Sequence, residues 1–334
     1  MSLLVASGLL AHAAACRTQP ALARFGAFAA EPRLDGDGLA MLVCSLVAGL
    51  GAQPIGALAA RGVGLDTGSD YWLVADPVCF VLGRSDVTLA GRVSDLTPEE
   101  TEELLLALNA HFHEDGLAFV APRPDLWLAH IPESFGLVTH SPERAQAMPL
   151  TRALPDGDAG PMWRRWQDEM QMLLHGHPVN LARESEGRAP ANAVWVWGGG
   201  RLADAGPASP ILVDAPATLV GDVLRGLASI PRTLDPGGEP RVVRVVPRLE
   251  QDGEVARFVA DVLAPHLAAL EQGRLRELTL VADGSGIAAA WTARAPSRWQ
   301  RLSAGWRARP LRVPDPSQAA ASTPTAASAP AMPA

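Results

Sequence analysis

The sequence predicts an α/β protein in which a sheet is covered by helices and a small α+β unit is inserted into the chain. Three observations lead to this prediction. The chain has 334 residues, 48% of them hydrophobic, which is enough for one large core or two smaller ones. Strand-like and helix-like segments alternate along its second half. A run of strand, helix, strand and strand occupies residues 85 to 132.

The first part of the chain is predicted to consist of strands separated by Gly/Pro-rich turns. SLLVASGLL and YWLVADPVCFVLG are typical of strands, and DVTLAGRVSDL is a further extended segment. LAMLVCSLVAGLG fits either a buried strand or a helix. The apolar start has no positively charged region, and His12 interrupts it, so a buried first strand is favoured over a weak export signal.

Two helices carry their own start or stop signals. Thr97 and Glu100 form a T-x-x-E capping box, and Pro98 suits a first turn. The strands LAFVAP and LWLAHIP come after this helix. The segment PMWRRWQDEMQMLLHGH is predicted to be the second helix, which ends by His177 because Pro178 follows.

The rest of the chain returns to α/β alternation. AVWVW, RVVRVV and LRELTLVAD are predicted strands, and ATLVGDVLRGLASI and GEVARFVADVLAPHLAALEQG are predicted helices. We therefore expect a discontinuous α/β core of residues 1–84 and 178–310, with an inserted α+β domain at 85–177. Residues 311–334 are rich in Pro, Ala and Ser and are expected to be a disordered tail.

Charge and cysteine content exclude several classes of protein. The net charge is −8, and all 28 basic residues are arginine, which argues against a nucleic-acid binder. Three cysteines without C-x-x-C spacing suggest neither a disulfide framework nor a zinc site, so a cytoplasmic protein is expected. No apolar stretch reaches the ~20 residues that a membrane span needs. The Arg/Trp-rich segment 294–312 is expected to pack on the core, the alternative being a partner-binding helix.

Common catalytic and metal motifs are not recognisable in the sequence. The pairs His111/His113 and His175/His177 point about 200° apart within a helix and cannot chelate one ion. WGGG does not continue as a Rossmann or Walker loop, and no G-x-S-x-G motif is present. Asp283, after a late strand, is weak evidence for a ligand site. We therefore expect no metal and no cofactor.

The segment from His177 to Gly200 is the densest in polar and special-geometry residues. Asn180, Arg183 and Asn192 can hydrogen-bond, and two prolines fix the backbone around them. Arg183 suits a phosphate or carboxylate, because its planar fork makes bidentate charged hydrogen bonds. The alternative is a loop held together by these groups for structural reasons alone.

The same residues carry a resemblance. HPVNLARESEGRAPANAVWVWGGG resembles the H-P-V-N-x-x-R…G…A-N…G-x-G segment of archaeal-type, cofactor-independent phosphoglycerate mutases, which belong to the alkaline phosphatase superfamily. GLDTGSDYWLVADPV, LNAHFHEDGLAF and EMQMLLHGHPVN are more similar to a proteobacterial group described as phosphoglycerate-mutase-like or RpfE-type regulatory proteins. The resemblance covers residues 40 to 205 best.

The resemblance implies an alkaline-phosphatase-like core sheet, two divalent metals, a phosphorylated serine and arginines that grip phosphoglycerate. The sequence departs from the family at the metal motifs. LLVASGLLAHAA has no carboxylate where the mutases have a D-G-x-G-D-like motif, and Gly284 stands where an A-D-H-S-like motif has histidine. Ser69 is the least unsuitable candidate for the serine that the mutases phosphorylate. Two-metal phosphoryl transfer needs those ligands.

These observations lead to the hypothesis of a catalytically degenerate, phosphoglycerate-mutase-like protein. It would bind a phosphorylated or carboxylated metabolite, or a protein partner, through Asn180, Arg183, Asn192 and His177. One alternative is a working mutase or phosphatase, which alone would require a divalent metal such as manganese. The other is a structural or regulatory interaction protein without a small-molecule ligand.

Overall fold

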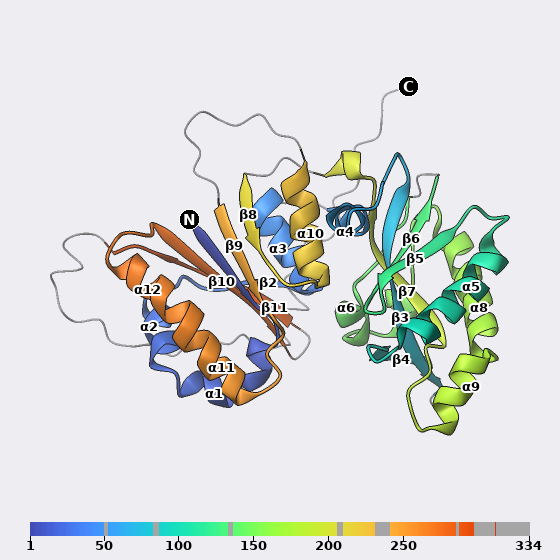
Figure 1. Cartoon of the computed structure of the whole chain (residues 1–334), viewed down its shortest axis with the longest axis horizontal. Coiled ribbons are helices and arrows are strands. Elements are labelled where there is room, and N and C mark those ends of the chain that lie inside the picture. The colour runs from blue at the N-terminus through green and yellow to red at the C-terminus, as the bar shows by residue number, and fades with distance from the viewer. Residues whose placement is uncertain are drawn as a thin grey trace.

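A computed structural model describes residues 1–49, 53–82, 87–132, 136–205, 210–230, 241–284, 287–296 and 311. Its elements form two bodies that lie side by side, each built on its own sheet (Figure 1). Parallel strands and helices alternate in the first body, and antiparallel strands make up the second. The predicted α/β class is confirmed.

The first sheet has the strand order β2-β11-β10-β1-β9-β8. β1 lies between β9 and β10 and is parallel to both, whereas β11 and β2 add antiparallel strands at one edge. Every residue of β1 is buried, as expected for a strand with both faces covered. The strands are β1 (Ser2–Ala6), β2 (Arg33–Asp35), β8 (Ile211–Asp214), β9 (Arg241–Val246), β10 (Glu277–Gly284) and β11 (Ile287–Arg294).

Helices cover both faces of this sheet. Leu4 and Ala6 of β1 pack in the cluster that includes the N-terminal and C-terminal helices, and Leu3 and Val5 pack on the opposite face. On the first face lie η1 (Leu9–His12), α1 (Ala13–Arg17), α2 (Pro20–Phe28), α11 (Asp252–Phe258), η3 (Val259–Leu263) and α12 (Ala264–Glu271). On the second lie α3 (Gly38–Ala48) and α10 (Leu219–Ser229).

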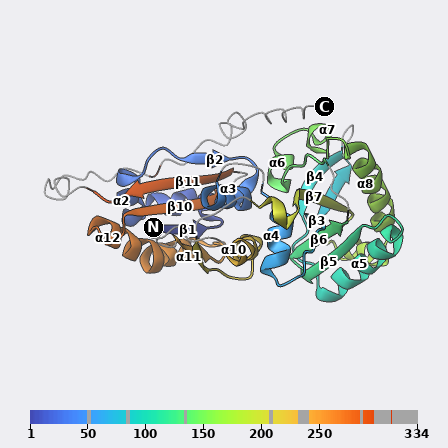
Figure 2. The ribbon, with the colours of Figure 1, turned by 90° about the horizontal axis from the view of Figure 1, so that it is seen from above.

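The second sheet is antiparallel and is arranged around the long strand β3. β3 pairs with β4, β6 and β7, and β5 extends the sheet beyond β6. α5 and α8 lie at the outer side of this body (Figure 2), as does α9 (Figure 1). The strands are β3 (Tyr71–Leu82), β4 (Val87–Arg92), β5 (Ala118–Arg123), β6 (Leu126–Ile131) and β7 (Ala193–Gly200). The helices are α5 (Pro98–Phe112), α6 (Pro142–Gln146), α7 (Leu150–Ala153), α8 (Gly160–His175) and α9 (Pro178–Ser185), followed by the turn η2 (Leu202–Asp204).

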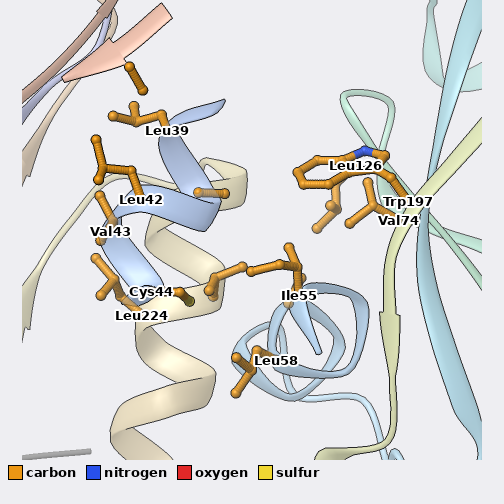
Figure 3. Packing of buried hydrophobic residues seen from close by; sticks show 14 of the residues in the cluster. Leu39, Leu42, Val43, Cys44, Ile55, Leu58, Val74, Leu126, Trp197 and Leu224 are labelled. Atoms are coloured by element: carbon orange, nitrogen blue, oxygen red, sulfur yellow. The ribbon is translucent and has the colours of Figure 1, made fainter. Parts of the chain in front are cut away.

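Helix α4 (Ile55–Gly62) connects the two bodies. It packs against α10 on one side and against β3 and β7 on the other. Leu58 and Ile55 of α4 lie in one apolar cluster with residues of both sheets (Figure 3). A Cβ atom on Gly62 or Gly226 would collide with the backbone of the facing helix. Glycine at these positions therefore lets α4 and α10 approach closely.

Strand pairing differs from the predicted boundaries at residues 84 and 178. β3 and β7, which those boundaries assign to the core, pair with each other in the second sheet. A single strand does not reveal its partner, because pairing depends on hydrogen bonds to distant segments. The division of the chain into domains stays a prediction.

Local structure also departs from the sequence at two places. Residues 38–48 form a helix, whereas the sequence allowed either a strand or a helix there. The sequence could not decide because a segment that is covered on most sides shows no clear hydrophobic periodicity. The predicted loop after His177 contains α9. Residues 297–310 of the Arg/Trp-rich segment and residues 312–334 of the predicted tail lie outside the described residues. None of the described helices combines the length and apolar character needed to cross a bilayer.

Candidate functional site

A cavity of about 320 Å³ lies where the two sheets meet. From the first sheet it is lined by Ser7, which follows β1, by Arg248, which follows β9, and by Asp283 near the end of β10. β1, β9 and β10 are parallel, so their carboxyl ends meet at this edge. From the second sheet, Asp76 of β3 and Arg92 of β4 line the opposite wall. In open α/β sheets ligands bind outside the carboxyl ends of the strands, which makes this cavity the candidate site.

Two helices begin at the cavity. Gly38 and Leu39 of α3 line it, as do Thr218 and Leu219 at the start of α10. Asp37 at the N-cap of α3 makes no side-chain cap hydrogen bond. The amide groups and the dipole at a helix N-terminus favour negative charge. These two helices therefore add positive potential to a cavity that also contains carboxylates.

Asp76 is the most buried carboxylate of the site. Its Oδ2 atom accepts a 2.7 Å hydrogen bond from Nε1 of Trp197 and lies 3.2 Å from Nε of Arg92. The Arg92 guanidinium also lies 3.3 Å from Oε1 of Glu143, and its Cζ is 5.9 Å from the centroid of the Trp197 ring. Burial raises the pKa of Asp76, although Arg92 and the Trp197 hydrogen bond oppose this. Desolvation alone would lower the pKa of Arg92, but Asp76, Glu143 and Asp283 raise it.

Asp283 fixes the turn that follows β1. The amide of Gly8 donates a 2.5 Å hydrogen bond to its Oδ1 atom. Gly8 has φ +82°, and a Cβ atom there would collide with the Leu249 carbonyl, so glycine is needed. Burial raises the pKa of Asp283, while the Gly8 hydrogen bond and the charge of Arg248 oppose this. Arg248 is exposed, and within the described residues no carboxylate lies within 4 Å of its guanidinium.

The donors around the cavity do not fit a divalent metal pair. Arg92 already holds Asp76 and Glu143, and Asp283 is hydrogen-bonded to the backbone. Across the described ranges, no group of three or more His, Cys, Asp and Glu side chains is arranged to hold a metal ion. A two-metal centre needs several carboxylates and histidines free to coordinate. The metals that the mutase resemblance implies therefore lack their ligands here.

Arg183 lies away from this cavity, in a network of its own. Its side chain is 1% exposed, and its nitrogens donate to the Ala189 carbonyl at 2.8 Å, to Glu100 at 2.8 Å and to Asp95 at 2.5 Å. Desolvation opposes the effect, but hydrogen bonds from Arg183 and Arg188 lower the pKa of Asp95. These contacts favour the structural alternative for Arg183, and its predicted ligand contact stays a prediction.

The other three predicted residues also bind the backbone. Asn180 is buried and donates to the Leu174 and Ala191 carbonyls at 2.8 and 3.0 Å. Asn192 accepts from the Phe80 amide at 2.7 Å and donates to its carbonyl at 2.9 Å. Nδ1 of His177 accepts from the Val179 amide at the N-cap of α9. The structure therefore brings Asn180 and Arg183 together around residues 189–191, whereas Asn192, just before β7, is hydrogen-bonded to Phe80 of β3.

Other residues considered from the sequence are separate from the cavity. His111 pairs with Glu169 at 3.2 Å, and Ser69 is an exposed turn residue. His175 and Asn192 line a second groove of about 580 Å³ between α8 and the β3–β4 hairpin, which we call the α8 groove. The α8 groove also contains Cys79, whose thiol pKa is raised by burial.

Sequence reasoning noted Asp283 but missed Asp76, Arg92 and Arg248. The available signal was that ADPV lies in a strand-like segment, where a carboxylate between apolar residues needs a partner. Residue type does not distinguish Arg92 and Arg248 from the other 26 arginines, because every basic residue of the chain is arginine.

No protein-family model matches the chain. Curated proteins that match it in sequence are 2,3-bisphosphoglycerate-independent phosphoglycerate mutases. The protein from Methanosarcina barkeri is 30% identical over 120 residues, 33% of this chain and 29% of the mutase. The one from Methanosarcina mazei is 41% identical over 51 residues, 15% of this chain and 13% of that protein. The alignments thus span less than a third of these relatives, and over the matched segments the chain is a distant homologue of cofactor-independent phosphoglycerate mutase.

Two solved structures align with most of the chain at low similarity. The cofactor-independent phosphoglycerate mutase from Thermoplasma acidophilum has 16% identity and a TM-score of 0.36, covering 93% of this chain and 96% of that one. The PH0037 protein from Pyrococcus horikoshii has 14% identity and a TM-score of 0.45, covering 89% and 88%.

Proposed function

We propose that this protein is a phosphoglycerate-mutase-like binding protein without two-metal phosphoryl transfer. It holds a small metabolite with a phosphate or carboxylate group in the cavity between its two sheets. The distant homology to phosphoglycerate mutases supports the choice of ligand class. Asp76, which is paired with Arg92 and Trp197, and Asp283, which accepts from the Gly8 amide, support the loss of metal chemistry. A role as a regulatory protein of the RpfE type is part of the same proposal.

Arg248 is the observation that carries the proposal. Arg92 also lines the cavity, but it is already paired with two carboxylates. The guanidinium of Arg248 is exposed and is not paired with any described carboxylate. An arginine fork binds phosphate or carboxylate through parallel charged hydrogen bonds. The N-terminus of α10, which begins beside it in the cavity lining, adds the same sign of potential.

Isothermal titration calorimetry with inorganic phosphate, 3-phosphoglycerate and O-phosphoserine tests this site. Arg248→Ala should weaken the binding of every probe that the wild type takes up by about tenfold or more. The matched control is Arg257→Ala, which removes an exposed arginine of α11 that does not line the cavity. If none of the probes binds, or if Arg248→Ala binds as tightly as wild type, the site is assigned wrongly.

Metal analysis and an activity assay separate this proposal from a working mutase. The purified protein should contain no stoichiometric divalent metal, and it should not interconvert phosphoglycerates when manganese is added. Bound metal together with turnover would establish the enzymatic alternative. Loss of ligand binding in all assays, with a protein partner recovered, would instead favour an interaction protein without a small-molecule ligand.

A further inference from the structure

The cavity between the two sheets is lined by more acids than bases. Two arginines line it, Arg92 and Arg248. Five carboxylates share the same walls: Asp37, Asp76, Asp125, Glu143 and Asp283. A ligand that carries only negative charge must therefore enter a space with a surplus of carboxylates.

The pairing of these groups shows where the surplus lies. Arg123 lies 2.9 Å from Asp125 through its Nε and 2.8 Å from Asp222 through its Nη1, so it is shared between these two carboxylates. Arg92 is shared between Asp76 and Glu143 and can neutralise only one of them. Burial is the main cause of the raised pKa of both Asp76 and Asp283, and the charge of Glu143 raises both further. Glu143 therefore opposes the ionisation of Asp76 and of Asp283.

Glu143 and Asp37 both line the cavity at the start of α3, next to Gly38. Oε2 of Glu143 is 3.3 Å from the point that a Cβ atom on Gly38 would occupy. Asp37 precedes this glycine, and Nδ1 of His140 and Nε of Arg144 lie 3.7 and 3.6 Å from its Oδ1 atom, beyond hydrogen-bond distance. Because both carboxylates line the cavity, a donor group of a bound ligand can meet them there.

We propose that the ligand of this cavity is a small zwitterion, in which an ammonium group accompanies the phosphate or carboxylate. The acid group binds Arg248, and the ammonium group binds Glu143 and Asp37. This inference rests on the proposed function, because it assumes that Arg248 receives the acid group. It adds a positively charged group to the acid group that the proposed function already assigns to the ligand. An ammonium group has three donors and no acceptor, which matches a wall of carboxylate oxygens.

Two probes that differ at one group test the inference. O-phosphoserine and 3-phosphoglycerate share the phosphate, the carboxylate and the three-carbon chain, and differ in an ammonium or a hydroxyl at the second carbon. With both configurations of each probe, titration calorimetry should show O-phosphoserine binding about tenfold tighter or more. Serine against glycerate is the corresponding pair if the acid group is a carboxylate alone.

The variants Glu143→Gln and Asp37→Asn should bring the affinity ratio of the two probes towards one, without a loss of affinity for 3-phosphoglycerate. Asp168→Asn, in the α8 groove, is the matched control and should leave the ratio as in wild type. Circular dichroism establishes that each variant is folded. If 3-phosphoglycerate binds as tightly as O-phosphoserine, the zwitterion is wrong and the anion site stands. If neither compound binds and phosphate does not either, both proposals fail.

Discussion

The indole Nε1 of Trp197 donates a hydrogen bond of 2.7 Å to Oδ2 of Asp76, across the pairing of β7 with β3. Arg92 reaches the same oxygen at 3.2 Å and lies over the indole ring. Burial raises the pKa of this carboxyl, and Arg92 and the Trp197 hydrogen bond offset that effect only in part. The wall of the cavity is thus held in place by one aromatic donor and one cation that meet at a single oxygen atom.

Trp197→Phe should destabilise the fold by about 2 kcal/mol, because a hydrogen bond to a charged, buried acceptor is lost and the ring shrinks. Urea unfolding measures the change. Trp195→Phe is the matched control, since its Nε1 donates to the neutral carbonyl of His140 at 2.8 Å and should cost only about 1 kcal/mol. Equal losses in the two variants would mean that the charge of Asp76 adds nothing to the bond.

Asp283→Asn should change how stability depends on pH. Burial raises the pKa of Asp283, so its protonated form is favoured in the folded state. The stabilisation from this group is complete below the ordinary pKa of an aspartate and is lost as pH rises through the raised value. At neutral pH the variant, which keeps an oxygen for the Gly8 amide, should therefore be more stable than wild type.

The advantage of Asp283→Asn should shrink as the pH is lowered to about 4, near the ordinary aspartate pKa. Thermal unfolding of both proteins between neutral pH and pH 4 measures this. An advantage that stays constant with pH would show that the charge of Asp283 is not its cause, and a variant less stable at neutral pH would show that this charge is favourable in the fold.

Arg183→Met should destabilise the protein by roughly 3 kcal/mol, because a buried guanidinium with three protein acceptors is removed. Arg188→Met is the control, since Arg188 contacts the same two carboxylates from a more exposed position. This variant should lose less of the free energy of unfolding. Guanidinium chloride unfolding measures both. Binding of the phosphate probes by Arg183→Met below its unfolding temperature should equal that of wild type if the structural alternative holds.

The ion pairs of Arg183 and Arg188 with Asp95 should stabilise the fold less in acid. Hydrogen bonds from Arg183 and Arg188 overcome desolvation and lower the pKa of Asp95, so its contribution exists above the ordinary aspartate pKa. It is lost as the pH falls through the lowered value. The gap in stability between wild type and Arg183→Met should therefore narrow below about pH 4. A gap that widens in acid would contradict the assignment.

Gly226→Ala should destabilise the contact between α4 and α10 by about 1 to 3 kcal/mol, because the new Cβ would meet the Leu58 carbonyl. Gly253→Ala is the control: nothing lies within 4 Å of a Cβ there, and alanine suits a helix better than glycine. Thermal unfolding should separate the two variants clearly. A neutral Gly226→Ala variant would show that the helices can move apart without cost.

Local signals were the most informative part of the sequence. The Thr97/Glu100 capping box forms as predicted, with hydrogen bonds of 3.1 and 2.9 Å, because all its atoms lie within four residues. The buried first strand and the helix that ends before His177 followed from similar short-range patterns. The segment 38–48 stayed ambiguous, because a run that is apolar on nearly every side fits a strand as well as a helix.

The candidate site could not be located in the same way. Arg183 looked like an anion contact because its residue type suits one, yet its partners Asp95 and Glu100 lie 88 and 83 residues away in the chain. Nothing in the short segment around an arginine shows which distant carboxylate it will meet. The comparisons confirm distant homology to phosphoglycerate mutases, whereas the predicted ligand contact of Arg183 stays a prediction.

The sequence by itself determined the α/β class, most of the helices and strands, and the distant relation to phosphoglycerate mutases, since each depends on patterns within a short segment. Only the tertiary structure decided that β3 and β7 belong to the second sheet and that Asp76, Arg92, Arg248 and Asp283 surround one cavity. The physical reason is that charge pairing and strand pairing act between segments far apart in the chain, and folding alone brings them within hydrogen-bond distance.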